Sequence, residues 1–471
     1  MRGSLAQIAH ALVGAHMAQD ASFEGVSTDS RTVAAGSLFV ALRGEHFDAH
    51  AFLDQVAQKG VAGVVVEQLP AGWTLPAIVV PDTLVALGQI ANVWRRQYTL
   101  PIIGVTGSNG KTTVKEMIAS ILAAAFGEAG RLATRGNLNN EIGVPLTVMR
   151  LAAEHQAAVI ELGMNHPGEI GRLSRIAEPT IGLVNNAQRE HQEFMHTVEA
   201  VARENGSVLA GLPTSGIAVF PSDDEFTPLW RSMAPQRAHG TITFGFDATA
   251  NVSCLHRATE FGSELAVTVR AHDMADEEFA VRLGAAGLHN VRNALAAIAC
   301  ALAADIPQEA IIHGLEAFAP VTGRLQRKRA ANGAVLIDDT YNANPDSVRA
   351  AIDVLAQAPS PRILVLGDMG EVGTQGRQFH EEIGAYAASR GIDRLLATGE
   401  LARHLAGAGA PGFAQHFEQF DELLAALDTV LGTQLGSKSD ATVLVKGSRF
   451  MKMERVVQHL LGFQHTSKEA H

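Results

Sequence analysis

Residues 104–113 read GVTGSNGKTT, and this stretch decides the fold. The apolar run Leu100–Val105 predicts a short buried strand that leads into it. After it, apolar residues recur at helical spacing until Gly127, which predicts a helix that begins within the motif. A glycine-rich loop between a strand and a helix N-terminus presents free backbone N–H groups and the positive end of the helix dipole. The stretch therefore predicts a phosphate site.

The side chains of this loop favour a phosphate site with Mg2+ over a plain turn. Lys111 adds a full positive charge, and the hydroxyl of Thr112 can bind Mg2+. Val105 stands where the strict motif has glycine, but an ordinary turn has no need for Lys-Thr-Thr in the first helical turn. The loop does not identify the reaction, because kinases, pumps, switches and ligases all use such loops. We expect nucleotide contacts from Gly107, Ser108, Asn109, Gly110, Lys111, Thr112 and Thr113.

The composition is that of a globular enzyme with several domains. The chain has 471 residues, 47% hydrophobic and 18% charged, which is too long for a single core and too apolar for a disordered chain. The net charge of −12 argues against a nucleic-acid partner or an anionic membrane surface. Cys254 and Cys300 lack metal-ligand spacing, and no stretch has the roughly 18 uninterrupted apolar residues of a membrane span. The N-terminus also lacks a signal-peptide pattern. We expect a cytoplasmic monomer without stable membrane association.

The expected elements divide the chain into three α/β units. Residues 1–82 alternate polar turns and short strands, whereas residues 83–319 repeat strand, loop and helix in the manner of a parallel sheet. Within the second unit, residues 241–283 alternate without helical period and predict an antiparallel side sheet. Residues 320–471 predict a second doubly wound, Rossmann-like sheet. We therefore expect a central domain with a parallel sheet and the phosphate loop (P-loop), between a small N-terminal and a C-terminal α/β domain.

Polar residues follow the expected strands at the ends where parallel sheets bind ligands. Glu161 ends the strand at 157–162, and His191 follows the strand at 180–186. Taken alone, Glu161 also fits a solvated strand-end acid, and His191 a loop histidine. Further on, Asn344 and Pro345 predict an N-cap and the first helical position after another strand. Two such units imply a cleft between them.

The ordered motifs of nearly the whole chain resemble those of the Mur ligase family. They are Ser27–Arg31, Gly44–His50, residues 104–113, Thr134–Pro145 (TRGNLNNEIGVP), Val159–Ile170 (VIELGMNHPGEI), Gly287–Ala297 (GLHNVRNALAA), Gly323–Arg324, Asp338–Ser347 (DDTYNANPDS), Leu366–Val372 (LGDMGEV) and Lys446–Met451 (KGSRFM). The resemblance implies an N-terminal domain that holds the UDP part of a nucleotide precursor, a central ATPase domain and a mobile C-terminal domain.

The reaction implied by the resemblance is ATP-dependent peptide-bond formation. ATP phosphorylates the terminal carboxylate of a UDP-N-acetylmuramoyl-tripeptide, and the amine of D-alanyl-D-alanine attacks the acyl phosphate. Because anions must approach each other, cations such as Mg2+ must screen them. The Asp-Asn-Pro-Arg signature of the ligase that adds the third amino acid is absent. That ligase, a folylpolyglutamate-synthase relative and a nucleotide-gated binding module are the alternatives.

The resemblance also implies roles for single residues. The catalytic set is Lys111 as phosphate clamp, Glu161 and His191 as metal ligands with Thr112, and Arg324 at the γ-phosphate. Further nucleotide contacts are implied for Asn290, Asn293 and Asp339. Substrate contacts are implied for Ser27, Thr28, Asp29, Ser30, Arg31, Asn137, Asn139, Asn140, Asn342 and Asn344. Turn formation is the competing explanation for the asparagines at 137–140 and for Asp29 and Ser30, and helix capping for Asn290.

One position departs from the family pattern. Many members have a lysine, carbamylated by CO2 and supporting a second metal, where this chain has Asn205. An amide cannot form that carbamate. Either Glu204 or Asn205 then supplies an oxygen directly, or the second metal is held more loosely; Arg203 is the weakest candidate because guanidinium is not a metal ligand. Ala49, where the family usually has glycine, is a smaller departure.

Overall fold

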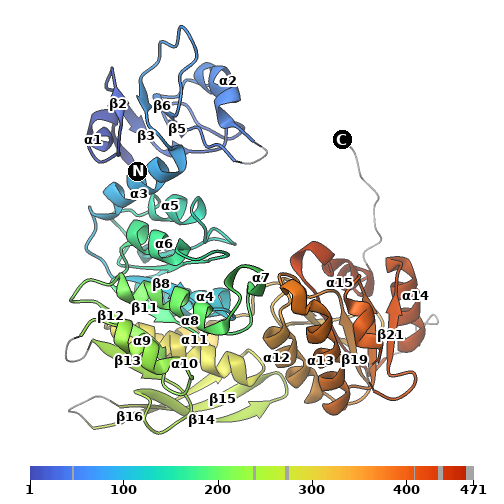
Figure 1. Ribbon diagram of the computed structural model, residues 1–471. Helices are drawn as coiled ribbons and strands as arrows, with labels where there is room; N and C mark the ends of the chain where they lie inside the picture. The colour runs from blue at the N-terminus through green and yellow to red at the C-terminus, as the bar shows by residue number, and fades with distance from the viewer. Residues whose placement is uncertain (45–46, 237–239, 271–274, 408, 433–438, 463–471) are drawn as a thin grey trace.

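In the computed structural model, three large β-sheets follow one another along the described part of the chain, and a two-stranded sheet of residues 2–4 and 22–24 lies beside the first (Figure 1). The structure describes residues 1–44, 47–236, 240–270, 275–407, 409–432 and 439–462. Glu45 and His46 of the motif at 44–50 lie outside the described residues. Helices cover each sheet, so the expected three-unit α/β architecture is confirmed.

The N-terminal sheet has five short strands in the order β2-β7-β6-β5-β4. Its strand β6 (Gly63–Val66) is buried along its whole length, because Val64 and Val66 face one core and Val65 faces another. The other strands and helices of this unit are β1 (Arg2–Ser4), α1 (Leu5–Ala9), β2 (His16–Met17), β3 (Ser22–Glu24), β4 (Val26–Ser27), β5 (Leu38–Val40), the 3-10 helix η1 (Ala49–Phe52), α2 (Leu53–Gln58) and β7 (Ala77–Val79).

Helix α3 (Thr83–Arg95) joins the N-terminal unit to the central one. Asp82 begins it, since its Oδ1 accepts hydrogen bonds from the backbone N–H groups of Leu84 and Val85 at 2.8 and 2.9 Å. The buried Arg95 side chain donates to the carbonyls of Ala177 and Glu178 in the central unit at 2.9 and 3.0 Å. One hydrophobic core therefore runs through both units.

The central sheet has nine strands in the order β16-β15-β14-β13-β12-β11-β8-β10-β9. Strands β8 (Ile102–Thr106), β9 (Arg131–Ala133), β10 (Ala157–Glu161), β11 (Ile181–Val184) and β12 (Ile217–Pro221) run parallel. One face packs against α4 (Lys111–Phe126), α10 (Leu288–Ala303) and α11 (Gln308–Ala317). The other packs against α5 (Gly143–Val148), α6 (Glu169–Ala177), α8 (Val198–Ala210) and α9 (Thr227–Met233). Burial on both faces explains why these strands read as continuous apolar runs.

The antiparallel side sheet predicted at residues 241–283 is confirmed for three of its four strands, which continue the central sheet. These residues form β13 (Thr241–Phe244), β14 (Val252–Thr259), β15 (Gly262–Val269) and β16 (Glu277–Leu283), which extend the central sheet. Strand β13 pairs in parallel with β12, and only β14–β16 are antiparallel to one another. Phe244 of β13 pairs with Val252 of β14, and this pairing joins the antiparallel strands to the rest of the central sheet.

The C-terminal sheet has six strands in the order β17-β18-β22-β19-β20-β21. Strand β17 (Gln326–Arg329) is antiparallel, whereas β18 (Val335–Asp339), β19 (Arg362–Leu366), β20 (Arg394–Thr398), β21 (Ala414–Phe417) and β22 (Thr442–Lys446) are parallel. Helices α12 (Pro345–Ala356) and α13 (Gly376–Ser389) cover one face, and α14 (Phe420–Leu431) and α15 (Glu454–Leu460) the other. Asn344 caps α12 and Pro345 is its first residue, as predicted.

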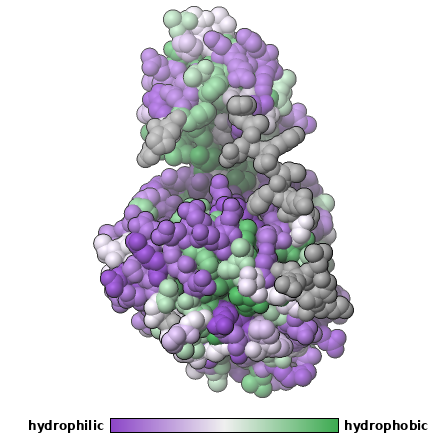
Figure 2. All heavy atoms as spheres, turned by 90° about the vertical axis from the view of Figure 1, so that its right-hand side faces the viewer, coloured by the Kyte–Doolittle hydropathy of each residue, from purple (hydrophilic) through white to green (hydrophobic). Residues whose placement is uncertain are grey.

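Polar residues dominate the surface seen from the side of the C-terminal unit, with apolar residues scattered among them (Figure 2). Among the described residues, no helix combines the length and the apolar character that crossing a bilayer requires.

Candidate active site

A cavity of about 1180 Å³ lies between the central and C-terminal units. Its wall joins the loop after β8, the ends of β10 and β11, the start of α10 and the segment before α12. Most of the site residues predicted from the sequence line this cavity, whereas Gly107 and Ser27–Arg31 do not. Those in the wall are Ser108, Asn109, Gly110, Lys111, Thr112, Thr113, Asn137, Asn139, Asn140, Glu161, His191, Asn290, Asn293, Arg324, Asp339, Asn342 and Asn344.

The loop after β8 depends on its glycines. Gly107 and Gly110 have φ values of 136° and 81°, which side chains other than glycine rarely adopt. A Cβ atom on Gly110 would also lie 2.5 Å from Oδ1 of Asn293. Helix α4 begins directly afterwards at Lys111. The loop therefore has the strand, turn and helix N-terminus that the sequence predicts for a phosphate site.

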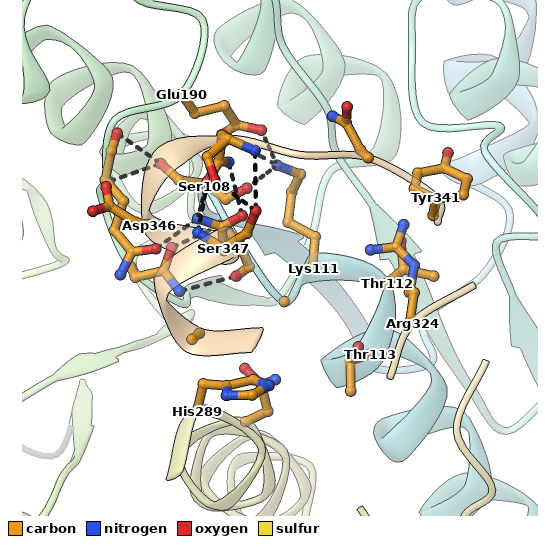
Figure 3. A pocket seen from close by; sticks show the side chains of 18 of the residues that line it. Ser108, Lys111, Thr112, Thr113, Glu190, His289, Arg324, Tyr341, Asp346 and Ser347 are labelled. Carbon is orange, nitrogen blue, oxygen red and sulfur yellow. Dashed lines mark hydrogen bonds and ion pairs between the residues drawn. The ribbon is translucent and has the colours of Figure 1, made fainter. Parts of the chain in front are cut away.

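Lys111 points along this loop toward Glu190 (Figure 3). Its Nζ donates to the carbonyl of Ser108 and to Oε1 of Glu190, both at 3.1 Å. Burial alone would raise the pKa of Glu190, but the charges of Lys111 and His191 outweigh it and hold the pKa below its ordinary value. Glu190 is not among the residues predicted from the sequence. The charged run Arg189-Glu190-His191 directly after a strand was the available signal.

Thr112 and Glu161 are brought together, as the predicted metal site requires. Oγ1 of Thr112 lies 3.2 Å from Oε1 of Glu161, which also accepts a 2.9 Å hydrogen bond from Asn139. Oε2 of Glu161 is buried and has no hydrogen-bond partner among the described residues. Mg2+ prefers oxygen ligands, so a hydroxyl beside a carboxylate with a free buried oxygen fits this ion.

Arg324 crosses from the C-terminal unit to the phosphate loop (Figure 3). Its Nη2 donates to Oγ1 of Thr112 at 2.9 Å, and its guanidinium lies 4.1 Å from the ring centroid of Tyr341. The stacked ring holds the planar group in place. A residue 212 positions after Thr112 thus completes the site.

His191 lies in the same cavity but contacts a different pair of acids. Its Nε2 is 3.3 Å from Oε1 of Glu190, and its Nδ1 is 2.6 Å from Oε2 of Glu371 in the C-terminal unit. Burial lowers the pKa of His191, but the two carboxylates outweigh that effect and raise it to about 9. In the part of the chain that is described, no group of three or more His, Cys, Asp or Glu side chains is arranged to hold a metal ion. The metal roles of Thr112, Glu161 and His191 stay predictions.

The predicted asparagines of α10 support the phosphate loop from behind. Asn293 donates to Oδ1 of Asn290 at 3.1 Å and accepts from Asn185 at 2.9 Å, while Asn185 also donates to the carbonyl of Asn109 at 2.8 Å. Beside them, burial and the charge of Lys446 lower the pKa of His289 to about 4, so its imidazole is neutral at pH 7. Adenine contacts by Asn290 and Asn293 stay a prediction.

The remaining C-terminal residues of the wall are also bound to one another. Asp339 pairs with Lys446 at 2.7 Å and accepts from the backbone N–H of Leu325 at 3.1 Å. Lys446 donates in addition to the carbonyl of Asn342 at 2.8 Å. Asn344 exchanges hydrogen bonds with Asn109 of the phosphate loop. The two units therefore meet through polar groups of the cavity itself.

Three family models match the chain in succession. They are the Mur ligase family catalytic domain at residues 22–95, the Mur ligase middle domain at 105–301, and the Mur ligase glutamate ligase domain at 323–449. The chain belongs to the Mur ligase family.

Full-length relatives agree with this assignment. A UDP-N-acetylmuramoyl-tripeptide--D-alanyl-D-alanine ligase of Escherichia coli is 38% identical over 462 residues, which is 97% of this chain and 98% of that protein. The ligase of the same name from Haemophilus influenzae is 37% identical, with 97% of each chain covered. A crystal structure of MurF from Acinetobacter baumannii has a TM-score of 0.89 at 35% identity, covering 98% of this chain and 99% of that one.

The segment Ser27–Arg31 of this Mur ligase lies apart from the cavity wall. Asp29 pairs with Arg31 at 2.8 Å, and Oγ of Ser27 accepts from the backbone N–H of Asp29 at 3.2 Å. The segment thus forms a turn, and its contact with a precursor stays a prediction.

Of the two alternatives for position 205 of this Mur ligase, the geometry does not favour the one in which Glu204 or Asn205 offers an oxygen to a metal. Both carboxylate oxygens of Glu204 accept 2.8 Å hydrogen bonds, from the backbone N–H groups of Gly168 and Ile170 at the start of α6. Oδ1 of Asn205 accepts from the backbone N–H of Gly107 at 3.0 Å. The two side chains stabilise a helix N-terminus and the phosphate loop, and neither lines the cavity.

Arg189 binds the C-terminal unit of this Mur ligase to the central unit. Its backbone N–H and its guanidinium both donate to Asp346, at 2.9 and 2.6 Å, and the guanidinium also donates to Glu382 at 2.9 Å. The Arg189 side chain is 25% exposed, and it lies 5.3 Å from the ring centroid of Phe379. These contacts hold α12 and α13 against the loop after β11.

We expect Arg189→Ala to loosen this docking. The change leaves Asp346 and Glu382 without their shared donor, at a cost of about 1–3 kcal/mol for hydrogen bonds to charged groups. Small-angle X-ray scattering should report a larger radius of gyration. Arg377→Ala is the matched control, because Arg377 pairs with the exposed Glu381 of its own helix. An unchanged scattering curve for Arg189→Ala contradicts the role.

Proposed function

We propose that the chain joins D-alanyl-D-alanine to the terminal carboxylate of a UDP-N-acetylmuramoyl-tripeptide with consumption of ATP. The observation that carries the proposal is its similarity to ligases of that name along 97% of the chain, at 38% identity. The cavity between two α/β units supports it, because a phosphate loop, a carboxylate and an arginine from the other unit meet there. The product is the pentapeptide precursor of peptidoglycan.

The proposed peptide-bond formation uses residues from both the central and the C-terminal unit. A carboxylate oxygen of the precursor attacks the γ-phosphorus of ATP, and the bond to ADP breaks. The dipeptide amine then attacks the acyl carbon and loses a proton, and phosphate leaves as the peptide bond forms. Lys111 and Arg324 are our candidates for neutralising the transferring group, because both are cations beside the phosphate loop. Thr112 and Glu161 are the candidates for holding Mg2+, which would offset the phosphate charge.

The remaining assignments belong to the same proposal. Ser27–Arg31 would receive the UDP part of the precursor, and the asparagines at 137, 139, 140, 342 and 344 would contact the substrates. Residues 1–82, 83–319 and 320–471 would be the corresponding domains. We propose a monomer that acts in the cytoplasm, where ATP is available.

Phosphate release tests the proposed function. With ATP and Mg2+, we expect release only when the UDP-tripeptide and D-alanyl-D-alanine are both present. The alternative is that the chain adds the third amino acid of the peptide. To test it, single amino acids replace D-alanyl-D-alanine, and a UDP-dipeptide precursor replaces the UDP-tripeptide; phosphate release with this pair favours the alternative. Phosphate released without an acceptor, or none with both substrates, overturns the proposal.

A further inference from the structure

The cavity contains a largely buried carboxylate, that of Glu190, which the proposed mechanism leaves without a role. The Glu190 side chain is 12% exposed, and its Oε1 lies 3.1 Å from Nζ of Lys111 and 3.3 Å from Nε2 of His191. It follows β11 on the central unit, at the edge of the sheet where the phosphate loop lies. A carboxylate beside the phosphate loop repels ATP unless a cation lies between them. Glu190 therefore needs a positive partner whenever nucleotide is bound.

Lys111 cannot serve both Glu190 and the nucleotide. In this structure its Nζ binds Glu190 and the carbonyls of the loop. When it moves to the phosphates, the carboxylate loses that partner. The nearest remaining group is the ring of His191, which lies between two carboxylates, 3.3 Å from Glu190 and 2.6 Å from Glu371, so its single positive charge cannot balance both. Its Nε2 becomes a metal ligand when the cation displaces the proton from that nitrogen.

The geometry of Glu190 and His191 is that of two neighbouring metal ligands. Ligands about 2.1 Å from a cation, at adjacent corners of an octahedron, lie about 3 Å apart. Oε1 of Glu190 and Nε2 of His191 are 3.3 Å apart. Both atoms belong to adjacent residues of one loop, so the separation is set locally.

The other side chains that could replace the carbamylated lysine of the family already have hydrogen-bond or ion-pair partners. Glu204 stabilises α6, and Asn205 binds the backbone of Gly107. Among the described residues, the lysines that line the cavity are Lys111 and Lys446. Lys446 is held by Asp339 and by the carbonyl of Asn342. A carbamylated lysine thus has no free candidate in the described wall.

We propose that Glu190 takes the place of the carbamylated lysine, and that it binds a second divalent cation together with His191 once the phosphates of ATP have drawn Lys111 away. The inference rests on the proposed use of ATP, but not on which peptide is made. Arg189, directly before Glu190, ties this loop to Asp346 and Glu382 of the C-terminal unit. Docking of that unit therefore positions the carboxylate.

Mn2+ binding tests this inference without turnover. Mn2+ is titrated into the full chain with a non-hydrolysable ATP analogue and followed by electron paramagnetic resonance. The wild type is expected to bind two ions. Glu190→Gln keeps the size of the side chain and should weaken one of them by at least about tenfold, since even loss of an outer contact costs that much. Glu190→Asp should bind this second Mn2+ with an affinity between those of the wild type and Glu190→Gln.

The controls separate a ligand from a merely structural carboxylate. Glu199→Gln removes an exposed acid of α8 and should leave both ions bound, because Glu199 pairs with the exposed Arg203 and does not line the described cavity wall. If Glu190 only restrains Lys111, Glu190→Gln will strengthen binding of the ATP analogue without metal and leave both Mn2+ affinities unchanged. That result overturns the proposal. Unfolding curves identify any variant that fails to fold. If Glu190→Gln fails to fold, the Mn2+ affinity of Glu190→Asp decides whether Glu190 is a ligand.

Bicarbonate provides an independent test. Wild-type phosphate release should be the same in CO2-depleted buffer as after addition of bicarbonate, and the intact mass should lack a carbamate. Activation by bicarbonate means that a lysine fills the position, and overturns the role of Glu190. Because Mn2+ binding needs neither precursor nor dipeptide, failure here differs from failure of the proposed ligase reaction.

Discussion

Lys111→Ala is expected to lower kcat by at least about 10³-fold, equivalent to roughly 4 kcal/mol of barrier. The substitution removes a full charge from the N-terminus of α4, where the phosphates of ATP are expected to bind. Two anions react in the proposed mechanism, so the lost charge affects every step that brings them together. Phosphate release with both substrates at saturation measures the effect. Turnover within tenfold of the wild type contradicts the assignment.

Stability must be separated from this loss of activity. Lys111 and Glu190 are 14% and 12% exposed, so Lys111→Ala leaves a buried carboxylate with His191 as its remaining charged neighbour. The double variant Lys111→Ala with Glu190→Gln removes that uncompensated charge. We expect the double variant to have a free energy of unfolding near that of the wild type, but a turnover as low as that of Lys111→Ala. Recovery of both means that Lys111 acts through stability alone.

Arg324→Ala is expected to lower kcat by about 10²-fold, the usual cost of losing one preorganised donor. Its guanidinium reaches Thr112 at 2.9 Å from the C-terminal unit and is held flat against Tyr341. Arg324→Lys keeps the charge and loses the planar stack, so we expect an intermediate kcat. Steady-state rates with varied ATP separate effects on kcat from effects on KM.

Arg327→Ala is the matched control for Arg324. Arg327 lies three residues further along the same segment and pairs with Glu260, which is 82% exposed. An exposed pair contributes little, so the rate should stay near that of the wild type. Equal losses in both variants mean that the connection between the units, rather than contact with phosphate, explains the effect.

Much of the candidate site was predictable because its determinants are local. Gly107 and Gly110 adopt backbone angles that favour glycine, and Lys111 begins the helix directly after them. Asn344 caps α12 through Ser347, three residues away. Such features depend on backbone geometry within one turn, which the order of residues specifies.

Features that depend on distant partners were missed or misjudged. Glu204 is a candidate metal ligand by its sequence position, but in the structure both of its oxygens accept hydrogen bonds at the start of α6. Residues 241–283 have the alternation of an antiparallel sheet, but that pattern does not reveal that β13 pairs in parallel with β12. Periodicity determines which face of a strand is buried, whereas the partner strand depends on the remaining chain.

By itself, the sequence determined the position of the phosphate loop, the division into three α/β units and the polar residues that follow the strands. These features follow from local backbone preferences and from the period of apolar residues. Only the tertiary structure decided that Lys111 meets Glu190, that Arg324 reaches Thr112, and that Arg189 joins the two units. These pairs lie 79, 212 and 157 positions apart. Charges so far apart in the chain come within hydrogen-bonding distance only when packed sheets and helices bring their backbones together.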